Sequence, residues 1–177
     1  MRDAGFRKKA RTFRLASDRS VAVLNVQASR WNQGGTGRFT LNLGVHWPET
    51  DRLMDRPTVG AEPKEYECVV RARIGDLLPG DLDRWWEIDS ETSIEQLGAE
   101  VAGVVSRVGL PWLLTLMEPE HSKSELERQG RYWELAAFAL AEENAEEARR
   151  FLALELGRKS RLHTRVRKWA QRHNLAT

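Results

Sequence analysis

The segment 22–47 restricts the fold most, because apolar and polar residues alternate along two stretches that are joined by glycines. Such alternation is typical of a β-hairpin with one buried face and one exposed face. We expect Gly34-Gly35 to form a two-residue turn, since tight hairpin turns require positive φ angles. This register places Gln27 opposite Asn42, on a face of uncharged hydrogen-bonding groups, and leaves the other face apolar.

The polar face of this hairpin is the leading candidate for a binding site. The alternating segment 66–74 predicts another strand, whose two arginines fall on the same side if its apolar residues join the core. Amides and hydroxyls both donate and accept hydrogen bonds, and arginines favour carboxylate or phosphate groups. The alternative is a face that is merely solvated or that the C-terminal helices cover. The candidate binding residues are Asn25, Gln27, Ser29, Thr40, Asn42, His46, Arg71 and Arg73.

The whole pattern predicts an α+β fold, in which an antiparallel sheet of about four or five strands packs on one main helix. The helix is expected over 92–108, where Thr92-Ser-Ile-Glu95 forms a capping box. Gly109 and Pro111 are expected to end it, as an αL residue followed by a helix breaker does.

The chain divides in two by the type of element expected. Residues 1–117 form the α+β domain, and 118–177 form a helical extension that docks on it. Within the domain, the proline-rich segment 48–63 is expected to be a loop. In the extension, Asn144 separates two helices of an αα-hairpin, and a basic amphipathic helix occupies 160–173.

Charge is distributed unevenly along the chain. Residues 1–47 contain nine Lys or Arg and two acids, residues 48–155 twelve and twenty-four, and residues 156–177 seven and none. The basic ends either balance the acidic middle within the fold or form a patch for an anionic partner. The second case gives an alternative function, electrostatic nucleic-acid binding. Its candidate residues are Arg7, Lys8, Lys9, Arg11, Arg165 and Lys168.

A third hypothesis is a small-molecule hydrolase or transferase. Asp83, Glu87 and Asp89 lie beside two tryptophans, and carboxyl groups in an apolar wall can act as general acids or bases. His46 is the proposed partner of these acids. The sequence contains no nucleophile motif that would support this chemistry.

The sequence predicts neither a metal site nor a cofactor. The histidines lack ligand spacing, and the single cysteine, Cys68, cannot form a thiolate site or an intramolecular disulfide. The longest uncharged run near the middle, 108–117, is about half the ~20 residues of a membrane span. We therefore expect a cytoplasmic protein without membrane contact.

Several segments in a fixed order resemble one protein family. They are GFRKKARTF, VLNVQASRWNQGG, FTLNLGVHW, RARIGDLLPGDLDRWWEID and the closing GLPWL, which together span 5–113. In this order they resemble the bacterial family known as domain of unknown function 4304. The resemblance implies a fold with a helix ahead of the first segment, where this sequence has four residues, and implies no established activity. Our main hypothesis is a non-enzymatic binding module for a protein or peptide partner.

Overall fold

The computed structural model describes residues 1–32, 34–54, 62–80, 83–159 and 161–175. They belong to two compact units. The first comprises Met1–His46 and Ala61–Glu118, and the second comprises Trp47–Gly60 and Pro119–Thr177. An antiparallel sheet in the first unit, together with helices in both, confirms the predicted α+β class. The second unit differs from the predicted extension because it also contains Trp47–Gly60.

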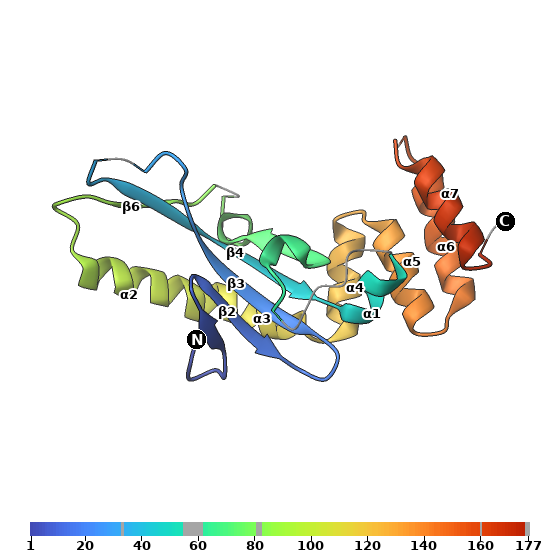
Figure 1. Ribbon diagram of the computed structural model, residues 1–177, viewed down its shortest axis with the longest axis horizontal. Coiled ribbons are helices and arrows are strands. Elements are labelled where there is room, and N and C mark those ends of the chain that lie inside the picture. The colour runs from blue at the N-terminus through green and yellow to red at the C-terminus, as the bar shows by residue number, and fades with distance from the viewer. Residues whose placement is uncertain (33, 55–61, 81–82, 160, 176–177) are drawn as a thin grey trace. The chain divides into compact units, whose positions relative to one another are not determined.

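The sheet of the first unit has six strands, whereas we predicted about four or five. They are β1 (Arg7–Lys9), β2 (Thr12–Ala16), β3 (Val21–Ala28), β4 (Gly37–His46), β5 (Val70–Arg73) and β6 (Trp86–Ile88). Their order is β1-β2-β3-β4-β5, and β6 pairs with the first residues of β4 (Figure 1). Strands β5 and β6 thus share the edge of β4 that β3 leaves open.

The predicted register of the β3–β4 hairpin was wrong by two residues. Asn42 lies opposite Asn25, and Gln27 lies opposite Thr40. Since side chains alternate with a period of two, this shift leaves every residue on its predicted face. The apolar and polar faces therefore exist as expected, although their cross-strand partners differ.

The hairpin loop explains the shift. The side chain of Asn32 accepts from the backbone N–H of Arg38 at 2.8 Å and donates to its carbonyl at 3.2 Å. The backbone N–H of Ser29 also donates to the Arg38 carbonyl at 2.8 Å, and the Asn32 amide replaces a strand residue only as the acceptor for the Arg38 N–H. Regular strand pairing therefore ends at Ala28, and the loop widens. Gly34 and Gly35 have φ values of 55° and 88°, and they serve a longer loop than the two-residue turn we predicted.

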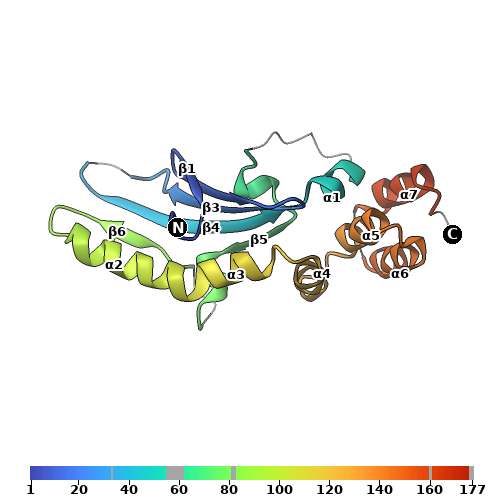
Figure 2. The same ribbon diagram turned by 90° about the horizontal axis from the view of Figure 1, so that it is seen from below.

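One long helix runs along the apolar face of the sheet (Figure 2). It consists of α2 (Ile94–Val104), a π-helical turn (Val105–Gly109) and α3 (Leu110–Thr115), and two 3₁₀-helices (Glu65–Glu67 and Ile74–Leu77) flank β5. The prediction that this helix ends at Gly109 was wrong. The N–H of Leu110 bonds to the carbonyl of Val105, and this widened turn lies directly before Pro111, which has no N–H to donate.

The helix also begins one residue later than the capping box predicted. Ser93 is the N-cap, and its hydroxyl accepts from the backbone N–H of Gln96 at 3.3 Å. The Thr92 hydroxyl donates instead to the Asp89 carboxylate at 2.7 Å. Thr92 therefore closes the turn after β6 and does not cap the helix.

Gly109 has a packing role in place of the predicted terminating role. A Cβ atom at this position would lie 3.2 Å from Cδ2 of Leu43 and 3.5 Å from Cδ1 of Ile74, and both of those side chains are fully buried. The glycine therefore allows the helix backbone to approach the sheet closely.

We expect Gly109→Val to lower the free energy of unfolding by about 1–3 kcal/mol, because added methyl groups overpack this contact. Gly98→Ala provides the matched control, since a Cβ atom at Gly98 meets nothing within 4 Å. That variant is expected to raise the free energy of unfolding by up to about 1 kcal/mol through helix propensity. Urea denaturation measures the free energy of unfolding of both variants. An equal increase in the two variants would contradict the close approach at Gly109.

The helix Ile94–Thr115 is the one helix in the described part of the chain that is long and apolar enough to cross a membrane, by length and composition alone. Of the 18-residue apolar stretch of that helix, 11% is buried. The Glu100 carboxylate forms an ion pair with Arg84 and accepts from Nε1 of Trp86 at 2.8 Å. These contacts tie the helix to β6. The absence of membrane contact stays a prediction.

The second unit is helical. Its helices are α1 (Pro48–Leu53), α4 (Pro119–Arg128), α5 (Tyr132–Ala141), α6 (Ala145–Leu156) and α7 (His163–Arg172). The prediction of a loop over 48–63 was wrong for 48–53, which form α1. Pro48 lies in the first turn of this helix, a position that tolerates proline. Residues 55–61 lie outside the described residues. Helices α5 and α6 form the predicted αα-hairpin, and the side chain of Asn144 caps α6 by accepting from the Glu147 N–H at 3.1 Å.

Candidate binding site on the polar face of the sheet

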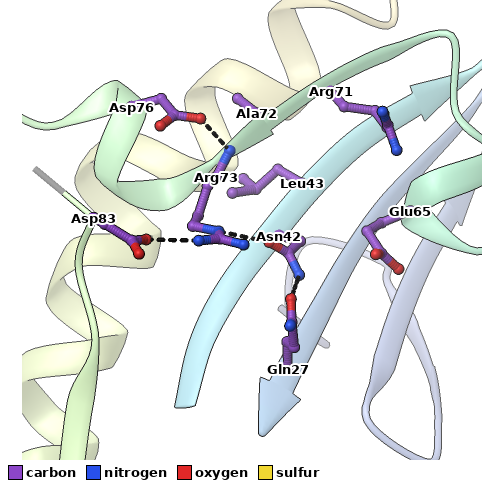
Figure 3. A pocket seen from close by; sticks show the side chains of 9 residues that line it. All are labelled: Gln27, Asn42, Leu43, Glu65, Arg71, Ala72, Arg73, Asp76 and Asp83. Carbon is purple, nitrogen blue, oxygen red and sulfur yellow. Dashed lines mark hydrogen bonds and ion pairs between the residues drawn. The ribbon is translucent and has the colours of Figure 1, made fainter. Parts of the chain in front are cut away.

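Four of the eight predicted binding residues lie together in a polar pocket of about 620 Å³ (Figure 3). Pairing of β4 with β5 places Arg73 opposite Asn42 and Arg71 opposite Gly44, which brings both arginines to the side of the hairpin amides. We call this site the polar pocket. Its lining residues are Gln27, Asn42, Leu43, Glu65, Arg71, Ala72, Arg73, Asp76 and Asp83.

A chain of hydrogen bonds crosses the polar pocket (Figure 3). Nδ2 of Asn42 donates to Oε1 of Gln27 at 2.5 Å, and Nε of Arg73 donates to Oδ1 of Asn42 at 3.4 Å. Nη1 of Arg73 then donates to Oδ1 of Asp83 at 2.7 Å. The chain links three strands to the segment before β6, so its members hold one another in fixed orientations.

Backbone contacts position the remaining charged groups. The Asp76 carboxylate accepts from the backbone N–H of Arg73 at 2.7 Å, and Nη1 of Arg71 donates to the carbonyl of Tyr66 at 3.2 Å. With Glu65 the polar pocket carries two guanidinium groups and three carboxylates. It therefore presents both signs of charge beside neutral amides, which suits a ligand that has donors and acceptors of its own.

Asn25 and Ser29 have local structural partners. Nδ2 of Asn25 donates to the hydroxyl of Thr12 at 2.9 Å and so ties β3 to β2. The Ser29 hydroxyl accepts from the backbone N–H of Trp31 at 3.1 Å within the hairpin loop. Neither residue lines the polar pocket.

Thr40 and His46 are on the predicted face but are buried, with 0% and 4% of their surfaces exposed. The Thr40 hydroxyl donates to the carbonyl of Arg84 at 2.7 Å, in the space between β5 and β6. The segment that leads into β6 thus covers this part of the face. Both residues fall outside the polar pocket.

Two charged lining residues, Glu65 and Asp76, were not predicted from the sequence. Each lies in a 3₁₀-helix beside β5, just outside the strand that we predicted over 66–74. A signal for Asp76 existed, since Asp often accepts from the backbone at the start of a helix. The sequence around Glu65 carries no such signal, because its place in the polar pocket depends on the path that the backbone takes beside β4.

The Asp83 carboxylate accepts from Nε1 of Trp85 at 2.9 Å and from Arg73. The tryptophan N–H, and next the arginine, lower the pKa of Asp83 below its ordinary value. Because the folded pKa is lowered, the ionised network stabilises the fold above the unfolded pKa of about 3.9. That stabilisation is lost as the pH falls through the folded value.

We expect Trp85→Phe and Arg73→Ala each to raise the pKa of Asp83 towards its ordinary value, since the indole N–H and the guanidinium both lower it. An NMR titration that follows the side-chain carboxyl carbon of Asp83 measures the midpoints. Trp31→Phe changes an exposed indole remote in sequence and serves as the control. A midpoint that is the same in all three variants would show that the network is not formed in solution.

The polar pocket does not bring the residues of the enzyme hypothesis together. Asp83 lines the polar pocket, whereas His46 does not. The pKa of Asp89 is lowered, chiefly by the Thr92 hydroxyl, and that of Asp83 is lowered as well. A general acid needs a raised carboxyl pKa, so these lowered values do not favour the general-acid role for Asp83 or Asp89.

The six candidate nucleic-acid residues are divided between the two units. Arg7, Lys8, Lys9 and Arg11 belong to β1 and the turn after it, whereas Arg165 and Lys168 lie on α7. The charge of Lys9 is matched by Glu62 at 2.6 Å, and the guanidinium of Arg165 lies 5.3 Å from the ring centroid of Trp133. Among the described residues, no group of three His, Cys, Asp or Glu is placed to hold a metal ion.

Comparison with known proteins identifies a family. Residues 1–114 match the model of a family described as domain of unknown function (DUF4304), which covers the sheet and the long helix of the first unit. No curated protein and no solved structure matches the chain.

Proposed function

We propose that this chain, which belongs to the domain of unknown function (DUF4304) family, is a non-enzymatic module that binds a protein or peptide through the polar pocket. One observation carries the proposal: the hydrogen-bond chain through Gln27, Asn42 and Arg73 orders the side chains before any partner arrives. Ordered side chains lose little entropy on binding, which favours recognition.

The chemistry of the polar pocket supports a peptide ligand. Three carboxylates line the polar pocket against two guanidinium groups, so it has no excess of positive charge to attract a simple anion. A peptide supplies N–H and C=O groups together and can add to the network without breaking it. Within the described residues no acceptor bonds to Nε2 of Gln27, which is exposed and so faces an incoming ligand.

A selection from a library of phage-displayed random peptides on the purified full chain tests the proposal. We expect selected peptides whose affinity falls about fivefold in Gln27→Ala, the loss of about one hydrogen bond. Arg73→Ala is expected to weaken them further, because it also releases Asn42 and Asp83. Gln96→Ala, an exposed glutamine on α2, is the matched control and leaves the affinity unchanged.

Fluorescence polarisation with synthetic peptides supplies the dissociation constants. Selected peptides that bind the Gln27 and Arg73 variants as tightly as the unchanged protein would contradict the proposal. So would a selection in which no peptide binds at micromolar concentration.

A further inference from the structure

A second cavity, of about 420 Å³, lies between α2 and the apolar face of the sheet. Phe13, Val26 and Phe39 line it from the strands, and Leu97 and Val101 line it from the helix. Helix α2 has no buried residue, so this part of the apolar face is not a packed core. Protein interiors contain few voids larger than a water molecule, and this volume is typical of small-molecule pockets.

The cavity has a physical origin in the sequence of the helix. Gly98 and Ala102, one turn apart, both line it, and a Cβ atom at Gly98 would meet nothing within 4 Å. The helix is held on both sides of this opening, since Glu100 binds Trp86 and Gly109 lies against Leu43. Small side chains on a helix that is fixed in place therefore leave the space unfilled.

The two edges of the sheet that flank the cavity differ in charge. Lys8 on β1 lies directly opposite Phe13 and hence on the apolar face, with Nζ 5.7 Å from the ring centroid. Its side chain is exposed, and no carboxylate pairs with it among the described residues. At the opposite edge of the sheet, the turn after β6 and the first turn of α2 carry Asp89, Glu91 and Glu95. An anionic group is therefore favoured at the β1 end alone.

We propose that this cavity binds a small amphiphile with an unbranched apolar chain and one anionic group. The apolar chain of the ligand lies between α2 and the sheet, and its anionic group lies beside Lys8. The walls supply hydrophobic contacts, and the lysine supplies the orientation. The site lies on the face of the sheet opposite the polar pocket, so its test does not depend on the proposed function.

Dodecanoate, used below its micelle concentration with the purified full chain, is the probe. Displacement of a fluorescent fatty-acid analogue gives the affinity, and native mass spectrometry gives the stoichiometry. We expect one dodecanoate per chain. Gly98→Leu, which fills the cavity, is expected to weaken binding at least about tenfold, and Ala99→Leu adds the same side chain at an exposed position and leaves binding unchanged.

Charge reversal of the probe and removal of the lysine test the orientation. Lys8→Gln is expected to weaken dodecanoate about threefold to fivefold and to leave dodecan-1-ol unchanged, since an exposed charge pair contributes that much. Dodecyltrimethylammonium is expected to bind more weakly than dodecanoate to the unchanged protein. Ala102→Leu is the second filling variant, and thermal unfolding shows that each variant is folded.

Three results would overturn the proposal. One is the lack of saturable dodecanoate binding, and another is equal affinity in the Gly98 and Ala99 variants. The third is binding only with a change to a dimer, which would show that a second copy of the chain covers the cavity.

Discussion

Replacing Trp169 with alanine is expected to lower the free energy of unfolding by about 3–5 kcal/mol, a typical cost for removing a buried aromatic side chain. Trp169 on α7 is fully buried, and its ring meets that of Trp133 edge-on, with centroids 6.3 Å apart. Its Nε1 donates to the carbonyl of Leu53 at 2.6 Å and so joins α7 to the end of α1. Urea denaturation followed by far-ultraviolet circular dichroism measures the loss.

Two further variants separate packing from hydrogen bonding at this position. Trp169→Phe keeps most of the ring contacts and removes the N–H, so we expect a cost of about 1–3 kcal/mol. Trp31→Ala removes an indole that is 72% exposed and is expected to change stability by less than about 0.5 kcal/mol. A similar loss in Trp169→Ala and Trp31→Ala would show that Trp169 does not anchor the helical unit.

Local periodicity in the sequence predicted most elements of this fold. The alternation along β3 and β4 identified both faces of the hairpin, because which side a residue faces depends only on its position in the strand. Helical spacing and the cap at Asn144 identified the αα-hairpin for the same reason. These features need no knowledge of distant contacts.

The errors arose where a residue acts through a partner elsewhere in the chain or through an unexpected local bond. Asn32 set the hairpin register by binding the backbone of Arg38. Gly109 permits contact with Leu43 and does not end a helix, because a π-turn absorbs the following proline. A glycine or asparagine supports several such roles, and the sequence alone does not distinguish among them.

The candidate site shows the same division. Alternation placed Gln27, Asn42, Arg71 and Arg73 on one face, and the structure brings these four into one pocket. The burial of Thr40 was not predictable, because it depends on the segment that passes over β4 and bonds to its hydroxyl. The apolar cavity was missed because a periodic apolar helix looks the same whether it packs tightly or leaves a space.

Replacing Gly44 with alanine is expected to lower the free energy of unfolding by about 3 kcal/mol, the upper part of the usual range for overpacking. A Cβ atom there would lie 2.7 Å from Cβ and 2.9 Å from Sγ of Cys68, and 3.0 Å from the carbonyl oxygen of Val70. Replacing a strand glycine by alanine normally stabilises the folded state by about 0.5–1 kcal/mol, because alanine loses less backbone freedom on folding. We expect the steric contact with Cys68 to outweigh this stabilisation. Chemical denaturation measures the difference.

A double-mutant cycle identifies the contact that is responsible. Cys68→Gly removes both atoms of the closest contact, so Gly44→Ala in that background is expected to cost at least about 1 kcal/mol less than in the unchanged protein. Cys68→Ala removes Sγ but keeps the Cβ atom at 2.7 Å, and it is expected to give less relief. Additive costs in the first cycle would show that Cys68 does not approach Gly44.

The same close approach connects the fold to the candidate site. Cys68 follows the 3₁₀-helix that holds Glu65 and the Tyr66 carbonyl, to which Arg71 donates. If the glycine is what lets this segment lie against β4, then Gly44→Ala displaces one wall of the polar pocket. We therefore expect the variant to shift the amide resonances of Glu65 and Arg71 and to weaken any peptide that the polar pocket binds, while resonances of Leu97 and Val101 on α2 stay unchanged. Unshifted signals at Glu65 would mean that this wall is held by other contacts.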